Sequence, residues 1–312
     1  MNRAGLVAAR LLQIVPTFLA IGAVVFVLAR LLPGDPVSAM LGDRASDEAV
    51  IRLRTAMGLD EPVWTQFLLF VGGIVRGEFG TSTAMRVPVT ALILERLPAT
   101  LMLTALATVL AIGIAVPLAF VAATQAGRWP DLLIRAVFQV GLSSPIFYVG
   151  LVLLTVFAAE LRWFPVGGYG MGLAEHLHHL LLPAVTLALS FSAVIMRNLR
   201  ASILGVLTAE FVDFARSKGL PRRVVLLRHV LRNALLSTVT LVGLHVGALL
   251  GGAVITESVF AVPGVGRLMV DSIFARDYPV IQALTLVLAV IVSLAFLATD
   301  LVQMWLDPRL TR

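Results

Sequence analysis

Long apolar runs separated by short polar connections divide this chain into six segments. The runs lie at residues 11–32, 99–124, 132–161, 180–204, 234–256 and 279–306. Each run supplies the roughly 20 residues that an α-helix needs to cross a hydrocarbon core about 30 Å thick. Because lipid offers no hydrogen-bond partner to an open backbone, the runs must be helices. The pattern predicts an all-α polytopic membrane protein with six transmembrane helices.

Composition supports this class and narrows the partners. The chain has 312 residues, of which 59% are hydrophobic and only 13% charged, and its mean hydropathy is +0.97. A net charge of +6 could indicate nucleic acid. However, the basic residues are interrupted by apolar runs and form no aromatic-studded stripe, so we expect membrane lipid and no nucleic acid as a partner. Without cysteines the chain has no disulfide, thiolate metal site or cysteine nucleophile.

The distribution of arginines predicts the orientation. Arg128 and Arg135 flank the connection between the second and third runs, whereas the connections after the third and fifth runs balance their arginines with acidic residues. Both chain ends are basic as well. Cytoplasmic loops carry the excess of Lys and Arg, so both termini are expected in the cytoplasm. The first run is longer than a signal-peptide core and no small-residue cleavage site follows it, which favours a retained helix at residues 1–32.

Residues 33–98 then form an extracytoplasmic segment. Ser46 is a plausible helix start, and Val50, Leu53 and Met57 follow at helical spacing. The apolar stretch at Val63–Val75 is too short to span a membrane easily, so an interfacial or packed helix is expected there. This segment is either a structural cap or a docking surface for an external partner.

The most basic connection lies between the fourth and fifth runs, at residues 210–233. Six cations occur there against two acidic residues, so the segment must face water. Its pattern is a helix over Phe211–Ser217, a break at Gly219-Leu220-Pro221, and a second helix over Arg222–Arg232. Glycine suits the end of one helix and proline the start of the next. We expect such a compact helical hairpin to bind a cytosolic partner, and we take it as the principal candidate site.

Few features favour chemistry within the chain. There is no P-loop, no H-E-x-x-H and no G-x-S-x-G motif, so neither catalysis nor a resident cofactor is expected. Asp300 and His245 lie within apolar runs and leave open an ion- or proton-coupled carrier acting alone. The cluster of His176, His178 and His179 leaves open a metal site, although an interfacial histidine-rich turn is favoured. A membrane scaffold or export subunit is a third alternative.

At the hairpin the chain resembles a known family, the permease subunits of ABC importers, in the dipeptide/oligopeptide/nickel branch. Asp213-Phe214-Ala215 stands where the family has E-A-A, and FARSKGL followed by LLRHVLRNAL is similar to the branch pattern. The similarity extends over nearly the whole chain. Further matching segments are residues 32–36 (LPGDP), 58–62 (GLDEP), 77–82 (GEFGTS), 257–260 (ESVF), 263–268 (PGVGRL) and 276–279 (RDYP).

The resemblance implies a fold and partners. It implies a type I ABC importer permease fold at residues 95–306, with the extracytoplasmic helical insertion before it and the coupling hairpin at 210–233. The implied partners are a homologous second permease, two cytosolic ABC ATPases that bind ATP and magnesium, and an extracytoplasmic substrate-binding protein. The implied location is the bacterial cytoplasmic (inner) membrane. The cargo stays open among dipeptides, oligopeptides, glutathione, nickel chelates, opines and sugars, with peptides favoured.

The resemblance also assigns candidate residues. The expected ATPase-docking residues are Phe211, Asp213, Phe214, Ala215, Arg216, Lys218, Gly219, Arg222 and Arg223. Phe211, Phe214 and Ala215 are expected to enter an apolar groove on the ATPase, and the cations to form a rim that fixes orientation. A gate or a contact with the binding protein is expected at Pro263, Gly264, Gly266 and Asp277, where a tight outer turn is the equally weighted alternative.

Overall fold

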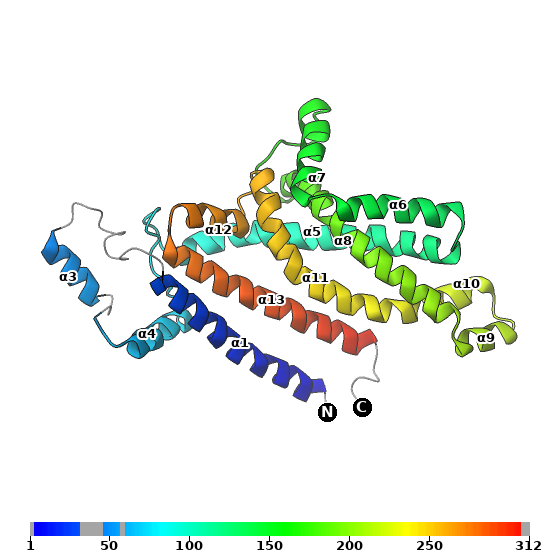
Figure 1. Cartoon of the computed structure of the whole chain (residues 1–312), viewed down its shortest axis with the longest axis horizontal. Helices are drawn as coiled ribbons and strands as arrows, with labels where there is room; N and C mark the ends of the chain where they lie inside the picture. The colour runs from blue at the N-terminus through cyan, green and yellow to red at the C-terminus, as the bar shows by residue number, and fades with distance from the viewer. Residues whose placement is uncertain (1–2, 32–45, 57–59, 307–312) are drawn as a thin grey trace. The chain divides into compact units, whose positions relative to one another are not determined.

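The computed structural model describes residues 3–31, 46–56 and 60–306, and within these ranges the chain is helical apart from connections and one isolated bridge between Thr81 and Pro88. Figure 1 shows the order of the elements. They are α1 (Arg3–Leu31), α3 (Asp47–Ala56), α4 (Val63–Val75), α5 (Val89–Thr124), α6 (Trp129–Ser143), α7 (Ile146–Leu153), η1 (Leu154–Glu160), α8 (Leu173–Leu207), α9 (Glu210–Ser217), α10 (Arg222–Val224), η2 (Val225–Leu231), α11 (Arg232–Val259), α12 (Val265–Phe274) and α13 (Tyr278–Leu306).

The chain divides into two compact units. The larger unit comprises Met1–Val7, Pro98–Arg267 and Leu294–Arg312, and the smaller comprises Ala8–Leu97 and Leu268–Ser293. The long helices α5 and α13 each contribute to both units. The basic hairpin and the histidine cluster belong to the larger unit.

Helix α8 forms the centre of the larger unit and packs against α6, α7 and α11. Two thirds of its apolar window is buried, far more than in α5 or α11, and this identifies it as the central helix. Helix α5 adds a row of buried side chains at every fourth position, in which Leu103 stands among six alanines: Ala99, Ala107, Ala111, Ala115, Ala119 and Ala123. Small residues on one helical face allow close approach of a neighbouring backbone, which is how membrane helices associate without a hydrophobic driving force.

Four helices among the described residues are long and apolar enough to cross a membrane. They are α5, α8, the Thr238–Val259 part of α11 and the Tyr278–Met304 part of α13. The bent pair α6 and α7–η1 makes a fifth if it is counted as one span. Helix α1 coincides with the first expected span, but only its Val15–Val27 stretch counts as apolar among the described side chains. The helical membrane fold is therefore confirmed, while the count of six stays a prediction.

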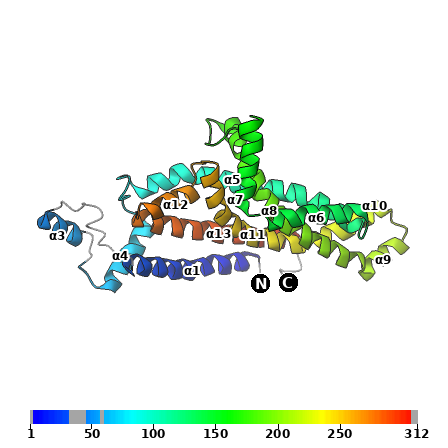
Figure 2. The ribbon, with the colours of Figure 1, turned by 45° about the horizontal axis from the view of Figure 1, so that its top comes forward.

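The third expected span differs most from the sequence-based expectation. Pro145 lies inside this apolar run, and the structure bends by 104° between α6 and the α7–η1 pair at this point. Figures 1 and 2 both show α7 turning away from the line of α6. Pro145 has no N–H to continue the ladder of α6, and Ser144 adopts an extended backbone, so the helix ends instead of bending gently.

Helix ends also extend beyond the apolar runs. Helix α5 begins at Val89, ten residues before the second run, and α8 begins at Leu173, seven before the fourth. The added turns contain polar residues such as Glu95 and His176, which lower the local hydropathy without interrupting the helix. An apolar run therefore predicts the membrane-embedded part of a helix but not the residue at which the helix begins.

In the smaller unit the predicted short helices are present. Helix α4 covers Val63–Val75, and α3 begins directly after Ser46. Phe26 of α1 is buried against two rings of α4, with centroids 5.2 Å from Phe67 and 5.6 Å from Phe70. Edge-on and tilted aromatic pairs of this kind stabilise helix packing. The expected contributions of Met57, Gly58 and the LPGDP segment lie outside the described residues.

Candidate functional site

The basic hairpin has the predicted helix–turn–helix form. Helix α9 ends at Ser217, and Gly219 adopts the left-handed conformation with φ of 73°. The backbone N–H of Leu220 then donates to the carbonyl of Ala215 at 3.4 Å, which closes the helix end. Pro221 stands immediately before α10 and fixes the start of the second helix. In Figure 1, α9 and α10 form a tip where α8 and α11 end.

The two sides of α9 face different surroundings. Val212 and Ala215 are buried in the core together with Val225 and Val230 of η2. On the other side Phe211 and Phe214 are 45% and 62% exposed. Two exposed phenylalanines on one short helix are unusual for a surface that meets only water. Ala215 therefore faces the interior of the hairpin, so a larger side chain there would first disturb the packing of α9 on η2. The ATPase-docking role of the nine residues named in the sequence analysis stays a prediction.

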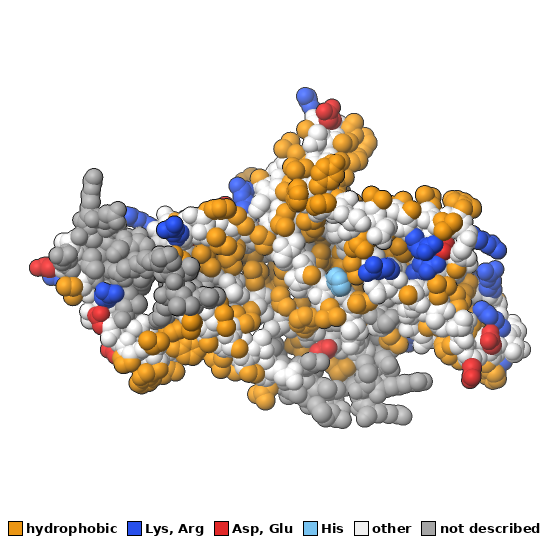
Figure 3. Space-filling view, viewed as in Figure 1, with side chains coloured by type: hydrophobic (Ala, Val, Ile, Leu, Met, Phe, Trp, Pro, Cys, Tyr) orange, Lys and Arg blue, Asp and Glu red, His pale blue; other side chains and the backbone are white. Residues whose placement is uncertain are grey.

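Charged side chains surround the exposed aromatic pair. Arg216 pairs with Asp213 at 3.1 Å, and the Lys218 ammonium lies 4.5 Å from the centre of the Phe214 ring. Arg222 and Arg223 are exposed at the start of α10. Figure 3 shows Lys, Arg, Asp and Glu side chains gathered near the hairpin tip. The arrangement is an apolar centre with a polar rim, which is the usual anatomy of a protein interface.

The second arm of the hairpin contains a segment that the sequence did not reveal. After one short turn of α-helix, residues Val225–Leu231 form a π-helix, η2, which continues directly into α11. A π-helical turn accommodates an extra residue and is frequent at functional sites. No period in the sequence marks it, because the apolar positions of VLLRHVL fit an ordinary helix equally well.

A buried carboxylate organises the motif that follows α11. Glu257 is fully buried and accepts a hydrogen bond of 2.5 Å from the Thr100 hydroxyl and one of 2.9 Å from the backbone N–H of Arg267. The Thr100 oxygen in turn accepts the backbone N–H of Val265 at 2.9 Å. Glu257 thus lies at the N-terminus of α12 and accepts a backbone N–H of its first turn.

The glycines of the same motif leave room for this carboxylate. A Cβ atom at Gly264 would overlap the Glu257 carboxyl group, and one at Gly266 would lie 2.7 Å from Cα of Val254. Pro263 is half-buried beside them. Tight packing of the turn around Glu257 accounts for the glycines of the PGVGRL segment. The role of Pro263, Gly264 and Gly266 as a gate or binding-protein contact stays a prediction.

Asp277, the fourth gate candidate, lies in the smaller unit. It is buried and accepts hydrogen bonds from the Ser82 hydroxyl and from the backbone N–H groups of Thr83 and Ala84, the latter two at 3.2 Å. The GEFGTS and RDYP segments, almost 200 residues apart in sequence, are therefore joined through one carboxylate. The role of Asp277 as a gate or binding-protein contact stays a prediction.

The three clustered histidines bind a loop of their own chain. The His176, His178 and His179 rings lie 2.7, 3.1 and 3.0 Å from the carbonyl oxygens of Tyr169, Trp163 and Gly167. A ring nitrogen facing a carbonyl must donate its N–H. His176 also stacks on Tyr169, whose phenol has its pKa raised by burial. The imidazoles therefore hold the connection before α8 against the start of that helix. Among the described residues, no group of three or more side chains is placed to bind a metal ion.

The intramembrane polar residues that could serve a carrier also have local partners. Nδ1 of His245 lies 2.9 Å from the Leu241 carbonyl one turn earlier, and its ring stacks on Phe191. Gln303, close to Asp300 in sequence, donates to the Thr240 hydroxyl at 2.9 Å. These contacts give His245 and Gln303 packing roles between helices of the larger unit.

The shortest ion pair among the described residues was not predicted from the sequence. Arg200 of α8 binds Asp131 of α6 through two hydrogen bonds of 2.7 Å, and Arg135 lies 3.4 Å from the same carboxylate. Asp131 is fully buried and also accepts the backbone N–H of Gly127 at 2.9 Å. An arginine inside an apolar run was a usable signal, because intramembrane charges are usually paired. The sequence gives no indication of which acid, 69 residues away, would be the partner.

The long apolar helices and the exposed basic hairpin define a polytopic helical membrane protein. Two family descriptions match the chain: "Binding-protein-dependent transport system inner membrane component" over residues 115–312, and the N-terminal component of the same systems over residues 4–104. The chain therefore belongs to the family of inner-membrane components of binding-protein-dependent transport systems. It is a multi-pass permease subunit of an ABC importer.

Curated relatives agree over almost their entire length. The chain is 38% identical over 307 residues to the oligopeptide transport system permease AppB of Bacillus subtilis, covering 96% of this chain and 97% of the relative. It is 38% identical over 299 residues to the glutathione transport system permease GsiC of Escherichia coli K12, covering 96% of each. A solved structure of the MetNI methionine ABC transporter matches with a TM-score of 0.58 at 16% identity, covering 69% of this chain and 96% of that one, which shows a shared fold.

Proposed function

We propose that this permease forms part of the translocation pathway of an ATP-driven importer for small peptides. The oligopeptide permease and the glutathione permease are equally similar to the chain, and glutathione is itself a tripeptide. Peptides of a few residues are therefore the cargo class that both relatives support. The chain contributes no nucleotide-binding motif, so energy must come from separate ATPases.

The observation that carries the proposal is the exposed aromatic pair on α9. Phe211 and Phe214 are exposed while Val212 and Ala215 anchor the same helix to the core. A helix fixed on one side and apolar on the other is suited to enter a groove on a second protein. Gly219 and Pro221 hold the helix at the tip, and exposed cations surround it. We assign this surface to the ATPase.

The remaining partners and the orientation follow from the same proposal. With the six predicted spans, the hairpin and both termini lie on one face, and the arginine-rich connections assign that face to the cytoplasm. A homologous second permease completes the pathway, two ATPases bind one hairpin each, and an external binding protein delivers the cargo to Pro33–Pro98 or to the connection around Asp277.

Reconstitution tests the function. The purified chain is placed in liposomes alone, or together with the second permease, the two ATPases and the binding protein of the same organism. Only the complete assembly is expected to accumulate a labelled tripeptide in an ATP-dependent manner. Accumulation by the chain alone under a proton or sodium gradient would establish the carrier alternative instead, and ATP-driven uptake without any binding protein would contradict the importer assignment.

The glycine of the hairpin turn provides a more specific prediction. Gly219 has a positive φ, which costs a β-branched residue about 1–2 kcal/mol or more, whereas asparagine tolerates it. Gly219→Val is therefore expected to displace α9 and reduce ATP-driven uptake about tenfold or more. Gly219→Asn, the matched control, keeps most of the uptake, because no atom lies within 4 Å of the position of its Cβ. Equal uptake by both variants and the parent would show that the turn conformation does not matter for coupling.

A further inference from the structure

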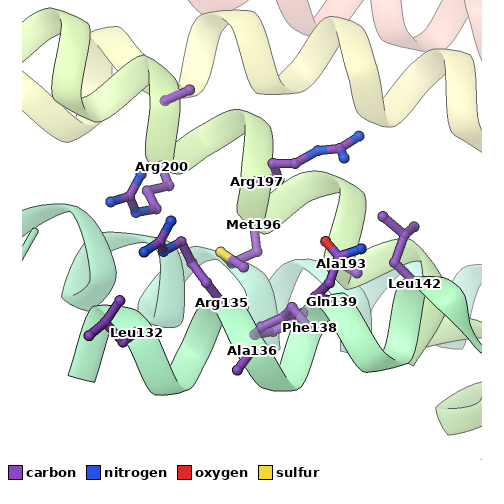
Figure 4. Close-up of a pocket in the computed structure, with 11 residues that line it drawn as sticks. Leu132, Arg135, Ala136, Phe138, Gln139, Leu142, Ala193, Met196, Arg197 and Arg200 are labelled. Atoms are coloured by element: carbon purple, nitrogen blue, oxygen red, sulfur yellow. The ribbon is translucent and has the colours of Figure 1, made fainter. Parts of the chain in front are cut away.

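A groove of about 500 Å³ lies between α6 and α8 in the larger unit. Figure 4 shows its lining. The polar wall consists of Arg135, Gln139, Arg197 and Arg200, and the rest is apolar, chiefly Leu132, Phe138, Leu142 and Met196. None of the motifs used above to assign the function contributes to it.

The charges of the groove do not cancel. Asp131 neutralises Arg200 through two hydrogen bonds of 2.7 Å, and Arg135 shares the same carboxylate at a longer 3.4 Å. Arg197 is exposed, and no described carboxylate lies within ion-pair distance of it. In Figure 4, Arg197 extends from α8 on the side of Gln139, whereas Arg135 and Arg200 point toward one another. The three arginines and one aspartate leave a surplus of two positive charges.

Arg135, one of the groove's cations, lies near the start of α6. Arg135 lies six residues after the start of α6 at Trp129, which corresponds to about 9 Å along the helix. Beside the groove, α6 exposes Leu133, Val137 and Val140, each by more than half of its surface. Helix α6 therefore presents a cation and exposed apolar side chains next to each other.

We propose that the groove between α6 and α8 binds an anionic phospholipid, with its phosphate at Arg135 and Arg197 and an acyl chain along α6. Guanidinium groups bind phosphate oxygens in a bidentate manner, and Gln139 adds an amide donor. Basic pockets between membrane helices at the cytoplasmic boundary are a known type of lipid site. A free anion would require no apolar flank, and this distinguishes lipid from inorganic phosphate. The inference is independent of the cargo.

The absence of cysteine in the chain makes a direct test simple. Ala201→Cys places a single thiol on the exposed rim of the groove, where a fluorophore is attached. The full-length chain is put into phosphatidylcholine nanodiscs that contain the same minor fraction of brominated phosphatidylglycerol or brominated phosphatidylcholine. Arg135 and Arg197 are each expected to raise the affinity for an anionic headgroup about fivefold. Quenching by brominated phosphatidylglycerol is therefore expected at a lipid fraction about 25-fold lower than quenching by brominated phosphatidylcholine.

Arg135→Gln combined with Arg197→Gln is expected to remove this preference, while Arg128→Gln, a cation at the start of α6 outside the groove, preserves it. Circular dichroism and size-exclusion chromatography confirm folding of each variant. Equal quenching by both lipids in the parent overturns the proposal. Loss of the preference on adding millimolar inorganic phosphate indicates a free-anion site, and its loss on adding trialanine assigns the groove to the transport pathway; both outcomes also overturn it.

Discussion

Replacing Phe211 and Phe214 together with alanine is expected to reduce the affinity of the permease for its ATPase by more than about a hundredfold and to abolish ATP-driven uptake. Both rings are exposed on α9, and Lys218 lies 4.5 Å from the centre of the Phe214 ring, which holds this aromatic surface in place. Buried aromatic anchors at interfaces contribute about 2 kcal/mol or more each. The measurement is co-purification of the ATPase together with uptake by reconstituted vesicles.

The control variant is Phe274→Ala. Phe274 ends α12 and is 84% exposed, so its truncation removes a similar apolar area at a position expected on the opposite side of the membrane. ATPase binding is expected to be unchanged in this variant. Because Val212 and Ala215 anchor α9 from beneath, the double variant should also keep its fold. If the double variant retains the ATPase at the parental level, the hairpin is not the docking surface.

Replacing Arg200 with methionine is expected to cost about 3–5 kcal/mol of stability, because it leaves the buried Asp131 carboxylate without its two shortest hydrogen bonds. Arg135 lies at 3.4 Å and is half-exposed, so it replaces only part of the lost interaction. The measurement is the midpoint of thermal unfolding of the detergent-solubilised chain, followed by size-exclusion chromatography. A single-residue effect of this size would be unusual for a surface ion pair.

The double variant Arg200→Met with Asp131→Asn separates the loss of a pair from general damage. Asparagine keeps an oxygen that accepts the backbone N–H of Gly127 but carries no charge. Most of the stability is therefore expected to return in the double variant, which gives a coupling energy in a double-mutant cycle. A double variant no more stable than Arg200→Met alone would show that packing of the arginine stem, and not its charge, is what matters.

Local signals made the hairpin predictable from sequence. Gly219 and Pro221 determine where one helix ends and the next begins, and both act through their own backbone preferences. The same holds for α4, whose Val63–Val75 bounds coincide with the apolar stretch after Pro62. The membrane class followed equally directly from the length of the apolar runs, and the comparisons with known proteins confirmed the importer family.

Long-range contacts were not predictable in this way. Asp131 and Arg200 are 69 residues apart, Thr100 and Glu257 are 157 apart, and Ser82 and Asp277 are 195 apart. Several of these residues lie in or beside conspicuous motifs, but the motif alone does not predict which distant residue each side chain contacts. The 104° bend is similar, because a proline at position 145 allows an interruption of the helix, whereas its direction depends on the packing of α7 on α8 and α11. Helix α12 went unpredicted because its ten residues are too few and too mixed to form an apolar run.

The second arm of the hairpin runs without a non-helical residue from Arg222 through η2 to Val259 at the end of α11. This stretch is about 55 Å long, so a tilt of about five degrees at one end displaces the other by about 5 Å. Glu257, with its bonds to Thr100 and to the start of α12, sits at that distant end. If this stretch turns as one rigid rod about the tip, the Glu257 contacts at its far end move by this larger distance.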